Sequence, residues 1–560
     1  MDLHGLTRKE FLTAALAAAA STALPFDLQE PASASEEITA EDLAAFEKVA
    51  RFKLTEEQRK ALLGSVRSQG QAFEALHKLP IDYSVEPPTV FRPFSLRPAT
   101  GKPGSSVTAE AVPKSLKRPR SEEDLAFMSV TELGHLLRTR QITSSELTEM
   151  YLSRLRTHGE KLLSVVTLTP ERAREAARRA DREIAAGRYR GPLHGIPCGI
   201  KDLFAMRGYP TTWGSEPHKD QVFDYDAALV ERLDAAGAVI VAKLSMGALA
   251  QGDVWFRGRT KTPWNPAQDS SGSSAGSGAA VAAGLVGFAI GTETLGSIMS
   301  PSLQSRVSGL RPTYGRVSRY GAMAVSWTLD KIGPMCRTIE DCAVVFAAIH
   351  GADPRDPSTV GRPFHYRPKP DLAKLKIGFL AGRDESLQDT SRLDKDDYLK
   401  ALVKLGAKPR PVRFSAPPQG MSLVLGVEAA AAFDEFTRSE RIELLKNSAW
   451  PMTYRANRYV SAVDYLTAQR ARSIFMRTFE EEFGDFDLFV APGISSPTLL
   501  STNFTGHPQV LVPNGEDEKG NPKGVSVTGR LYGEGLLCAV AAMLQRELGH
   551  VGRRPDLSKL

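Results

Sequence analysis

Cysteine is scarce in this sequence, with only four thiols in 560 residues, Cys198, Cys336, Cys342 and Cys538. No two of them have the Cys-x-x-Cys spacing, so neither a zinc ribbon nor a dithiol redox motif is encoded. So few cysteines over this length also exclude a small disulfide scaffold. We expect the thiols to be buried like small apolar side chains, and we leave open whether any of them pair.

A dominant charge and long apolar runs are missing too. The 71 Lys and Arg residues exceed the 65 Asp and Glu residues by only 6, which does not predict nucleic acid as a partner. Beyond the amino-terminal segment no run of about eighteen apolar residues occurs, so no stable membrane span is expected in the mature chain. With 42% apolar and 24% charged residues, the composition is that of a globular protein.

The first 23 residues have the pattern of an export signal. Arg8 and Lys9 precede an apolar run at 11–20, and the small residues 21–23 follow it. This order is typical of a secretory signal that is cleaved after its small residues. Residues 8–12 also resemble a weakened twin-arginine motif, with Lys9 in place of the second arginine. We predict a periplasmic or extracellular protein, with the twin-arginine pathway as a candidate route. The alternative is an Ala-rich first helix of a cytoplasmic enzyme.

Residues 24–126 are predicted to be a helical and Pro-rich accessory region. Helical patterns occur at 40–52 and 55–77, and the second begins with a threonine cap and two acidic residues. Residues 80–114 are rich in Pro, Ser, Thr and Gly and lead into a basic cluster at 114–120. We interpret this cluster as a solvated linker rather than a dock for an anionic partner.

From residue 127 onward, helical patterns alternate with short apolar runs. Continuously apolar strands between helices indicate an α/β sheet that is buried on both faces. Helices are expected to open at Ser129 and Thr143 and to cover 171–188 and 226–236, with strands at 238–242 and 286–290.

Two loops are rich in glycine and serine, at 269–278 and 291–301. Glycines before a serine let the backbone turn sharply and direct several N–H groups at one point. Such a turn can hold a serine nucleophile beside its oxyanion donors. Taken alone, each loop is better explained by close packing against helices.

Other hydrolase motifs were weighed and excluded. Residues 272–276 fit G-x-S-x-G, which would make Ser274 the nucleophile of an α/β-hydrolase elbow. That elbow follows a buried strand, whereas residues 263–270 are dominated by proline and polar side chains. The sequence also has no Ser-x-x-Lys and no His-Glu-x-x-His, which excludes penicillin-binding enzymes and zincins.

Several motifs together resemble the amidase signature family, in order and spacing, from about residue 127 to about residue 554. Lys201, Ser273 and Ser297 are 72 and 24 residues apart, as in that family. The matching segments are Gly195-Ile196-Pro197-Cys198-Gly199-Ile200-Lys201-Asp202, the loop around Ser273, and residues 291–301, 309–318, 329–334, 487–492 and 506–515. The resemblance implies an α/β fold with a large mixed β-sheet covered by helices on both faces, and a catalytic domain over 127–560.

The resemblance also implies a Ser-Ser-Lys triad. Ser297 would be the nucleophile, Ser273 the bridging serine after a cis peptide bond, and Lys201 the general base. Only a neutral lysine can accept a proton, and an apolar surround lowers the pKa of a lysine. The expected reaction is hydrolysis of a small-molecule carboxylic amide through an acyl-enzyme, with no metal and no organic cofactor. The oxyanion hole is implied at the backbone N–H groups of Thr294, Leu295, Gly296 and Ser297.

The sequence departs from the family pattern near these residues. Leu295 replaces a glycine, and we expect its side chain to alter the turn and narrow the acyl pocket. The other departures are Ser271 and Ala275 for glycines, Glu293 for Asp, Met299 for Arg, and residues 242–248 for a stretch with Asn and Glu.

Two further functions fit the same resemblance. One is the glutamine-hydrolysing subunit of a tRNA-dependent amidotransferase, which an export signal disfavours because charged tRNA is cytosolic. The other is a catalytically inactive binding protein on an amidase fold. A homodimer is left open, and substrate-binding residues are expected at 208–220 and 420–470.

Overall fold

The structure is a computed structural model that describes residues 38–50, 52–80, 91, 105–446, 448–494 and 496–560. The predicted export signal at residues 1–23 lies outside the described residues. The chain forms two compact units, Met1–Thr89 with Ser415–Phe479, and Val90–Phe414 with Glu480–Leu560. These units do not coincide with the segments expected from the sequence, because the helices of the accessory region pack with residues far along the chain.

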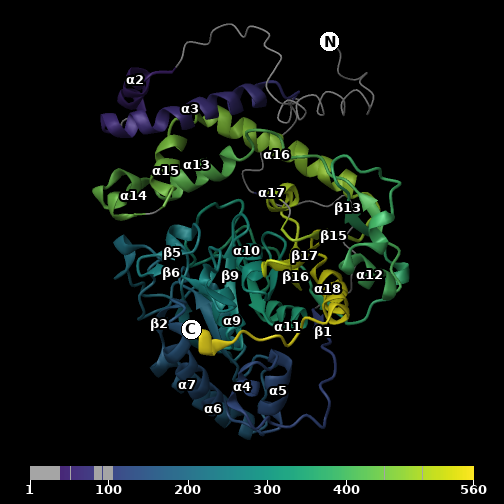
Figure 1. Cartoon of the computed structure of the whole chain (residues 1–560). Coiled ribbons are helices and arrows are strands. Elements are labelled where there is room, and N and C mark those ends of the chain that lie inside the picture. Colours follow the sequence, from purple (N-terminus) through teal and green to yellow (C-terminus); the bar gives the residue numbers. More distant parts are fainter. Residues whose placement is uncertain (1–37, 51, 81–90, 92–104, 447, 495) are drawn as a thin grey trace. The chain divides into compact units, whose positions relative to one another are not determined.

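The first unit is helical (Figure 1). Leu43, Leu62 and Val66 share a buried cluster with Ala456 and Tyr459, which no local sequence pattern relates to them. Thr55 caps its helix through a capping box, as the sequence predicted. The helices are α2 (Ala40–Ala50), α3 (Glu56–His77), α13 (Leu423–Ala432), α14 (Asp434–Arg438), α15 (Trp450–Asn457) and α16 (Ala462–Phe483), the last of which runs on into the second unit.

The buried carboxylate of Glu47 links separate segments of this unit through hydrogen bonds. It accepts hydrogen bonds from the Leu54 N–H, the Arg59 Nε and the Tyr459 hydroxyl, each at 3.0 Å. A buried carboxylate is tolerated when its lone pairs are satisfied in this way.

The second unit is built on an 11-stranded mixed sheet. The central strands β9, β3 and β4 are parallel, whereas β11 and β10 run antiparallel to their neighbours. In sheet order the strands are β14 (Arg410–Val412), β13 (Ile377–Leu380), β15 (Leu488–Pro492), β17 (Pro522–Gly529), β16 (Gln509–Glu516), β10 (Ser308–Arg311), β11 (Lys331–Cys336), β9 (Phe288–Glu293), β3 (Pro197–Lys201), β4 (Val239–Leu244) and β2 (Val165–Leu168).

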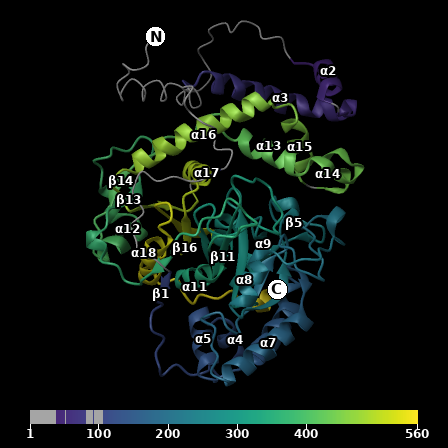
Figure 2. The same cartoon turned by 180° about the vertical axis from the view of Figure 1, so that it is seen from behind.

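Helices cover both faces of this sheet, which confirms the predicted fold class (Figures 1 and 2). Ser129 and Thr143 form the capping boxes of α5 and α6. The helices are α4 (Glu122–Ala126), α5 (Val130–Arg138), α6 (Ser144–Arg154), α7 (Pro170–Ala185), α8 (Ala228–Ala235), α9 (Ala275–Ala282), α10 (Met299–Gln304), α11 (Ile339–Ile349), α12 (Asp397–Lys404), α17 (Ser496–Thr505) and α18 (Glu534–Leu548).

In the described part of this unit, three two-stranded sheets accompany the large one, among them the hairpin of β7 (Lys261–Thr262) and β8 (Asn265–Asp269). Residues 265–269 therefore are a strand, but a partly exposed one outside the large sheet, so the α/β-hydrolase elbow stays excluded. The other two pair β5 (Val254–Trp255) with β6 (Gly258–Arg259), and β1 (Ser106–Val107) with β12 (His365–Tyr366).

The basic cluster at 114–120 was expected to be a solvated linker. It is partly attached to the folded unit, because the Arg118 guanidinium donates to Glu146 at 3.1 Å. All four cysteines are buried and none is in a disulfide. No helix within the described ranges is long and apolar enough to cross a membrane.

The strand register determines where the candidate site residues lie. β3 and β9 are parallel with Ile200 opposite Ile290, so their carboxyl ends reach the same edge of the sheet. Lys201 ends β3 and Glu293 ends β9. In parallel sheets this edge is where ligands usually bind.

Candidate active site

Lys201 and Ser273 are in direct contact. Lys201 is fully buried, and its Nζ donates to Ser273 Oγ at 2.7 Å and to Thr292 Oγ1 at 3.0 Å. Burial lowers the pKa of Lys201 to about 7, although the negative charges of Asp330 and Glu293 oppose this shift. A lysine with such a pKa is neutral often enough at neutral pH to accept a proton.

The backbone around Ser273 is tightly constrained. The peptide bond between Gly272 and Ser273 is cis. A Cβ on Gly272 would lie 1.8 Å from the carbonyl oxygen of Gly252, so only glycine fits at this position. The close approach explains why one glycine of the usual pair is retained here although the other is Ser271.

Ser274 links the loop of Ser273 to the segment that carries Ser297. Its N–H donates to the Ser297 carbonyl oxygen at 3.2 Å. Its Oγ accepts from the Thr292 N–H at 3.2 Å and donates to the Thr292 carbonyl at 3.1 Å. The hydroxyl is thus engaged with main chain, which argues against Ser274 as a nucleophile.

Residues 294–297 form the turn between β9 and α10. Gly296 has φ +85°, a left-handed conformation that glycine adopts without strain. Within the described part of the chain, the N–H groups of Leu295, Gly296 and Ser297 donate no hydrogen bond. They are therefore candidate donors to an oxyanion. The Leu295 side chain is exposed rather than folded into the protein.

The Glu293 carboxylate fixes the residues that follow this turn. Its Oε2 accepts the N–H groups of Ile298 and Met299 at 2.9 and 3.0 Å, so the carboxylate grips the two residues that follow Ser297. Met299 contributes its main-chain N–H to this contact, and its side chain is buried. In the sequence, Glu293 is recognisable only as a departure from the family pattern, and this role is not visible there.

The Glu293 carboxylate is held ionised. Its Oε1 accepts from Arg311 Nη1 at 2.8 Å and from Asn503 Nδ2 at 2.9 Å, and all three side chains are buried. Burial alone would raise the pKa of Glu293, but the positive charges of Arg311 and Lys331 outweigh it and hold the pKa at about 2. The turn therefore rests on a charged group over the whole physiological pH range.

Asp330 fixes the other side of the turn. It follows the loop after β10, and its Oδ1 accepts from Thr294 Oγ1 at 2.6 Å. Its Oδ2 accepts the N–H groups of Val325 and Ser326 at 2.8 and 3.1 Å. Burial raises the pKa of Asp330.

A second buried lysine lies on the neighbouring strand. Lys243 of β4 pairs with Asp202 at 2.8 Å, both side chains being fully buried. Asp202 Oδ2 also accepts the Thr212 N–H at 2.9 Å, which holds the 208–215 loop beside Lys201. Burial lowers the pKa of Lys243. This pair was not predicted from the sequence, although a lysine inside an apolar strand indicates a buried partner.

The structure thus joins Lys201 to Ser273 and brings Ser297 to the same place through main chain. The Ser297 side chain is 8% exposed, and within the described residues its hydroxyl forms no hydrogen bond. Apo geometry of this kind is common, because catalytic hydrogen bonds often tighten only around substrate. No group of three or more His, Cys, Asp and Glu side chains that could hold a metal occurs among the residues described.

A family model, Amidase, matches residues 146–502 of the chain, a span that includes Lys201, Ser273 and Ser297. The chain belongs to the amidase family. The resemblance seen in the motifs is therefore confirmed. This member is an amide hydrolase by its family and by its structural neighbours.

Relatives with different names are similar to this chain over most of its length. A Mycobacterium tuberculosis protein named "Putative amidase AmiD" is 34% identical over 470 residues, covering 78% of this chain and 98% of the relative. A glutamyl-tRNA(Gln) amidotransferase subunit of an Anaeromyxobacter species is 33% identical over 490 residues, covering 78% and 99%. The native peptide amidase of Stenotrophomonas maltophilia matches in structure with a TM-score of 0.67 and 28% identity, covering 77% and 98%.

Proposed function

We propose that this amidase is a serine amidohydrolase in which Lys201, Ser273 and Ser297 form the catalytic triad. The observation that carries the proposal is the 2.7 Å hydrogen bond between the buried Lys201 Nζ and Ser273 Oγ. A buried lysine with a pKa lowered to about 7 does not stabilise the fold by its charge, but it is suited to act as a general base.

The residues divide the chemistry between them. Neutral Lys201 accepts the Ser273 proton while Ser273 accepts the Ser297 proton, and the Ser297 Oγ attacks the amide carbonyl. The tetrahedral oxyanion is bound by N–H groups of the 294–297 turn, and the relay returns a proton to the departing amine as the C–N bond breaks. Water then hydrolyses the ester of Ser297 by the reverse proton transfers.

The oxyanion turn matters as much as the triad. Loss of one oxyanion donor typically costs about 10²–10³ in rate. Glu293 and Asp330 hold the turn from its two sides, so the donors are already oriented before substrate arrives. This is the arrangement expected when electrostatic preorganisation supplies much of the catalysis.

Labelling with a fluorophosphonate tests the nucleophile. The wild-type protein should be labelled at Ser297, as located by mass spectrometry of the modified peptide, and Ser297→Ala should not be labelled. Ser274→Ala is the matched control, because Ser274 lies beside Ser273 and was the nucleophile of the rejected elbow. Labelling of Ser297→Ala as fast as wild type would refute the proposal and favour an inactive amidase-like binding protein.

The glutamine-hydrolysing amidotransferase subunit is the second candidate. It is supported by the relatives of that name at 33% identity. Release of ammonia from glutamine by the purified protein would favour it, whereas hydrolysis restricted to other amides would exclude it.

We also propose that the protein is exported, on the basis of residues 1–23. The test is amino-terminal sequencing of the protein from fractionated cells. A terminus near Leu24 outside the cytoplasm is expected, and an intact Met1 in the cytoplasm would contradict it.

Light scattering of the same preparation would decide whether the protein is a homodimer.

A further inference from the structure

The loop between β10 and β11 runs along the triad. Past its middle, the Met323 N–H donates at 3.0 Å to the carbonyl of Leu203, which is two residues after Lys201. At its end, Asp330 binds Thr294 in the turn that precedes Ser297. The loop therefore connects the side of the general base to the side of the nucleophile.

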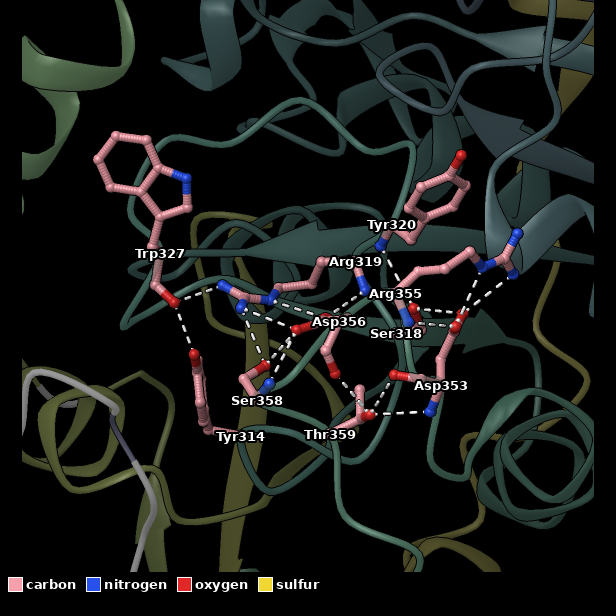
Figure 3. A network of polar contacts seen from close by, with 10 residues as sticks. All are labelled: Tyr314, Ser318, Arg319, Tyr320, Trp327, Asp353, Arg355, Asp356, Ser358 and Thr359. Carbon is pink, nitrogen blue, oxygen red and sulfur yellow. Dashed lines mark hydrogen bonds and ion pairs between the residues drawn. The ribbon is translucent and has the colours of Figure 1, made fainter.

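Within this loop the main chain of Trp327 is fixed from two directions (Figure 3). Its carbonyl oxygen accepts from the Tyr314 hydroxyl at 2.5 Å and from the Arg319 guanidinium. Arg319 is itself held by Asp356 at 3.3 Å and by Ser358 Oγ at 2.9 Å. The indole points away from this network, and 46% of the Trp327 side chain is exposed.

An exposed indole on a fixed backbone favours the binding of an apolar ligand group. Exposed aromatic surface gains free energy when a ligand covers it, and a fixed backbone lowers the entropy cost of that contact. Leu295 adds a second apolar side chain, 36% exposed, on the turn that Asp330 binds through Thr294. Leu295 lies two residues before Ser297, and Trp327 lies three residues before Asp330, which binds the turn of Ser297 through Thr294. Both partly exposed side chains therefore belong to segments that adjoin the proposed reaction centre.

Charged groups of the same turn and loop are already paired. Glu293 binds Arg311, Arg319 binds Asp356, and Asp330 binds Thr294 and the backbone of 325–326. Lys331 donates to the Leu329 carbonyl. Each is thus engaged by the protein rather than directed at the charged groups of a substrate such as glutamine.

We propose that Trp327 and Leu295 are specificity-determining residues, and that the substrate is a neutral amide with an alkyl or aryl group beside the scissile bond. This inference rests on the proposed function, because it assumes that Ser297 is the nucleophile. The proposal names the class of amide substrate, which family membership leaves undefined.

The test compares labelling of Ser297 by ethyl and octyl fluorophosphonates. Wild type should react faster with the octyl reagent, and Trp327→Ala should lower the octyl-to-ethyl ratio about tenfold, as expected for the loss of ~60 Å² of apolar contact. Trp327→Phe should keep most of the ratio, and Trp327→Gln should lose it. The matched control is Val403→Ala, since Val403 of α12 is similarly exposed at 45% and should leave the ratio unchanged.

The outcomes separate the two proposals. A ratio that is the same in wild type, Trp327→Ala and Trp327→Gln overturns the specificity inference, while labelling at Ser297 still supports the triad. Failure of wild type to be labelled at Ser297 overturns both. Hydrolysis of glutamine in preference to hexanoyl anilide would also overturn the inference.

Discussion

Replacing Lys201 by methionine should make the protein more stable in acid while abolishing its activity. The ordinary lysine pKa is 10.5, and burial lowers that of Lys201 to about 7. One pH unit corresponds to about 1.4 kcal/mol, so the charged form in the folded protein costs about 5 kcal/mol. Methionine also loses the hydrogen bonds to Ser273 and Thr292, at about 1 kcal/mol each, which leaves a net gain of about 3 kcal/mol.

The sign of the pH dependence follows from proton binding. Below pH 7 Lys201 is protonated in both the folded and the unfolded chain, so the wild type carries the whole penalty. Between pH 7 and pH 10.5 only the unfolded chain stays protonated, so wild-type stability rises with pH until the penalty is gone. The advantage of Lys201→Met should therefore be largest near pH 6 and should vanish, or reverse, near pH 10.

The assay is urea unfolding of both proteins from pH 6 to pH 10, together with kcat/KM of the wild type over the same range. Because the proposed mechanism uses the neutral lysine as the base, kcat/KM should rise with pH through a midpoint near 7 and then level off. Lys243→Met is the matched control. It leaves Asp202 buried without its partner and should destabilise the protein at every pH. A stability difference for Lys201→Met that is independent of pH, or a flat rate profile through pH 7, would refute the reasoning.

Two further changes probe the groups that hold the oxyanion turn. Glu293→Gln leaves the buried Arg311 without an anionic partner, so unfolding by urea should show a loss of about 3 kcal/mol and kcat should fall. Glu293→Asp keeps the charge and should lose less, and a Glu293→Gln protein within 1 kcal/mol of wild type would contradict this account. Asp330→Asn removes a negative charge that raises the pKa of Lys201, so the midpoint of the pH–rate profile should move to lower pH. A midpoint that stays in place or moves to higher pH would show that Asp330 does not act on Lys201.

Local patterns predicted much of the secondary structure. Thr55, Ser129 and Thr143 were expected to begin helices, and each caps one, because a capping side chain bonds to the backbone of its own first turn. Residues 239–242 of the predicted strand at 238–242 lie in β4, since a strand buried on both faces needs apolar residues on each side. The domain organisation was less accessible, because the apolar faces of α2 and α3 are covered by residues around 456–459.

For the site, the sequence by itself determined the family and the positions that we propose as reactive. The spacing of Lys201, Ser273 and Ser297 and the glycines around them are written in the order of residues. Only the tertiary structure decided what supports them. Glu293 with Arg311, Lys243 with Asp202, and Asp330 with Thr294 join residues from different strands and loops. The pKa of Lys201 is likewise set by burial and by charges distant in sequence, so it exists only once the sheet has formed.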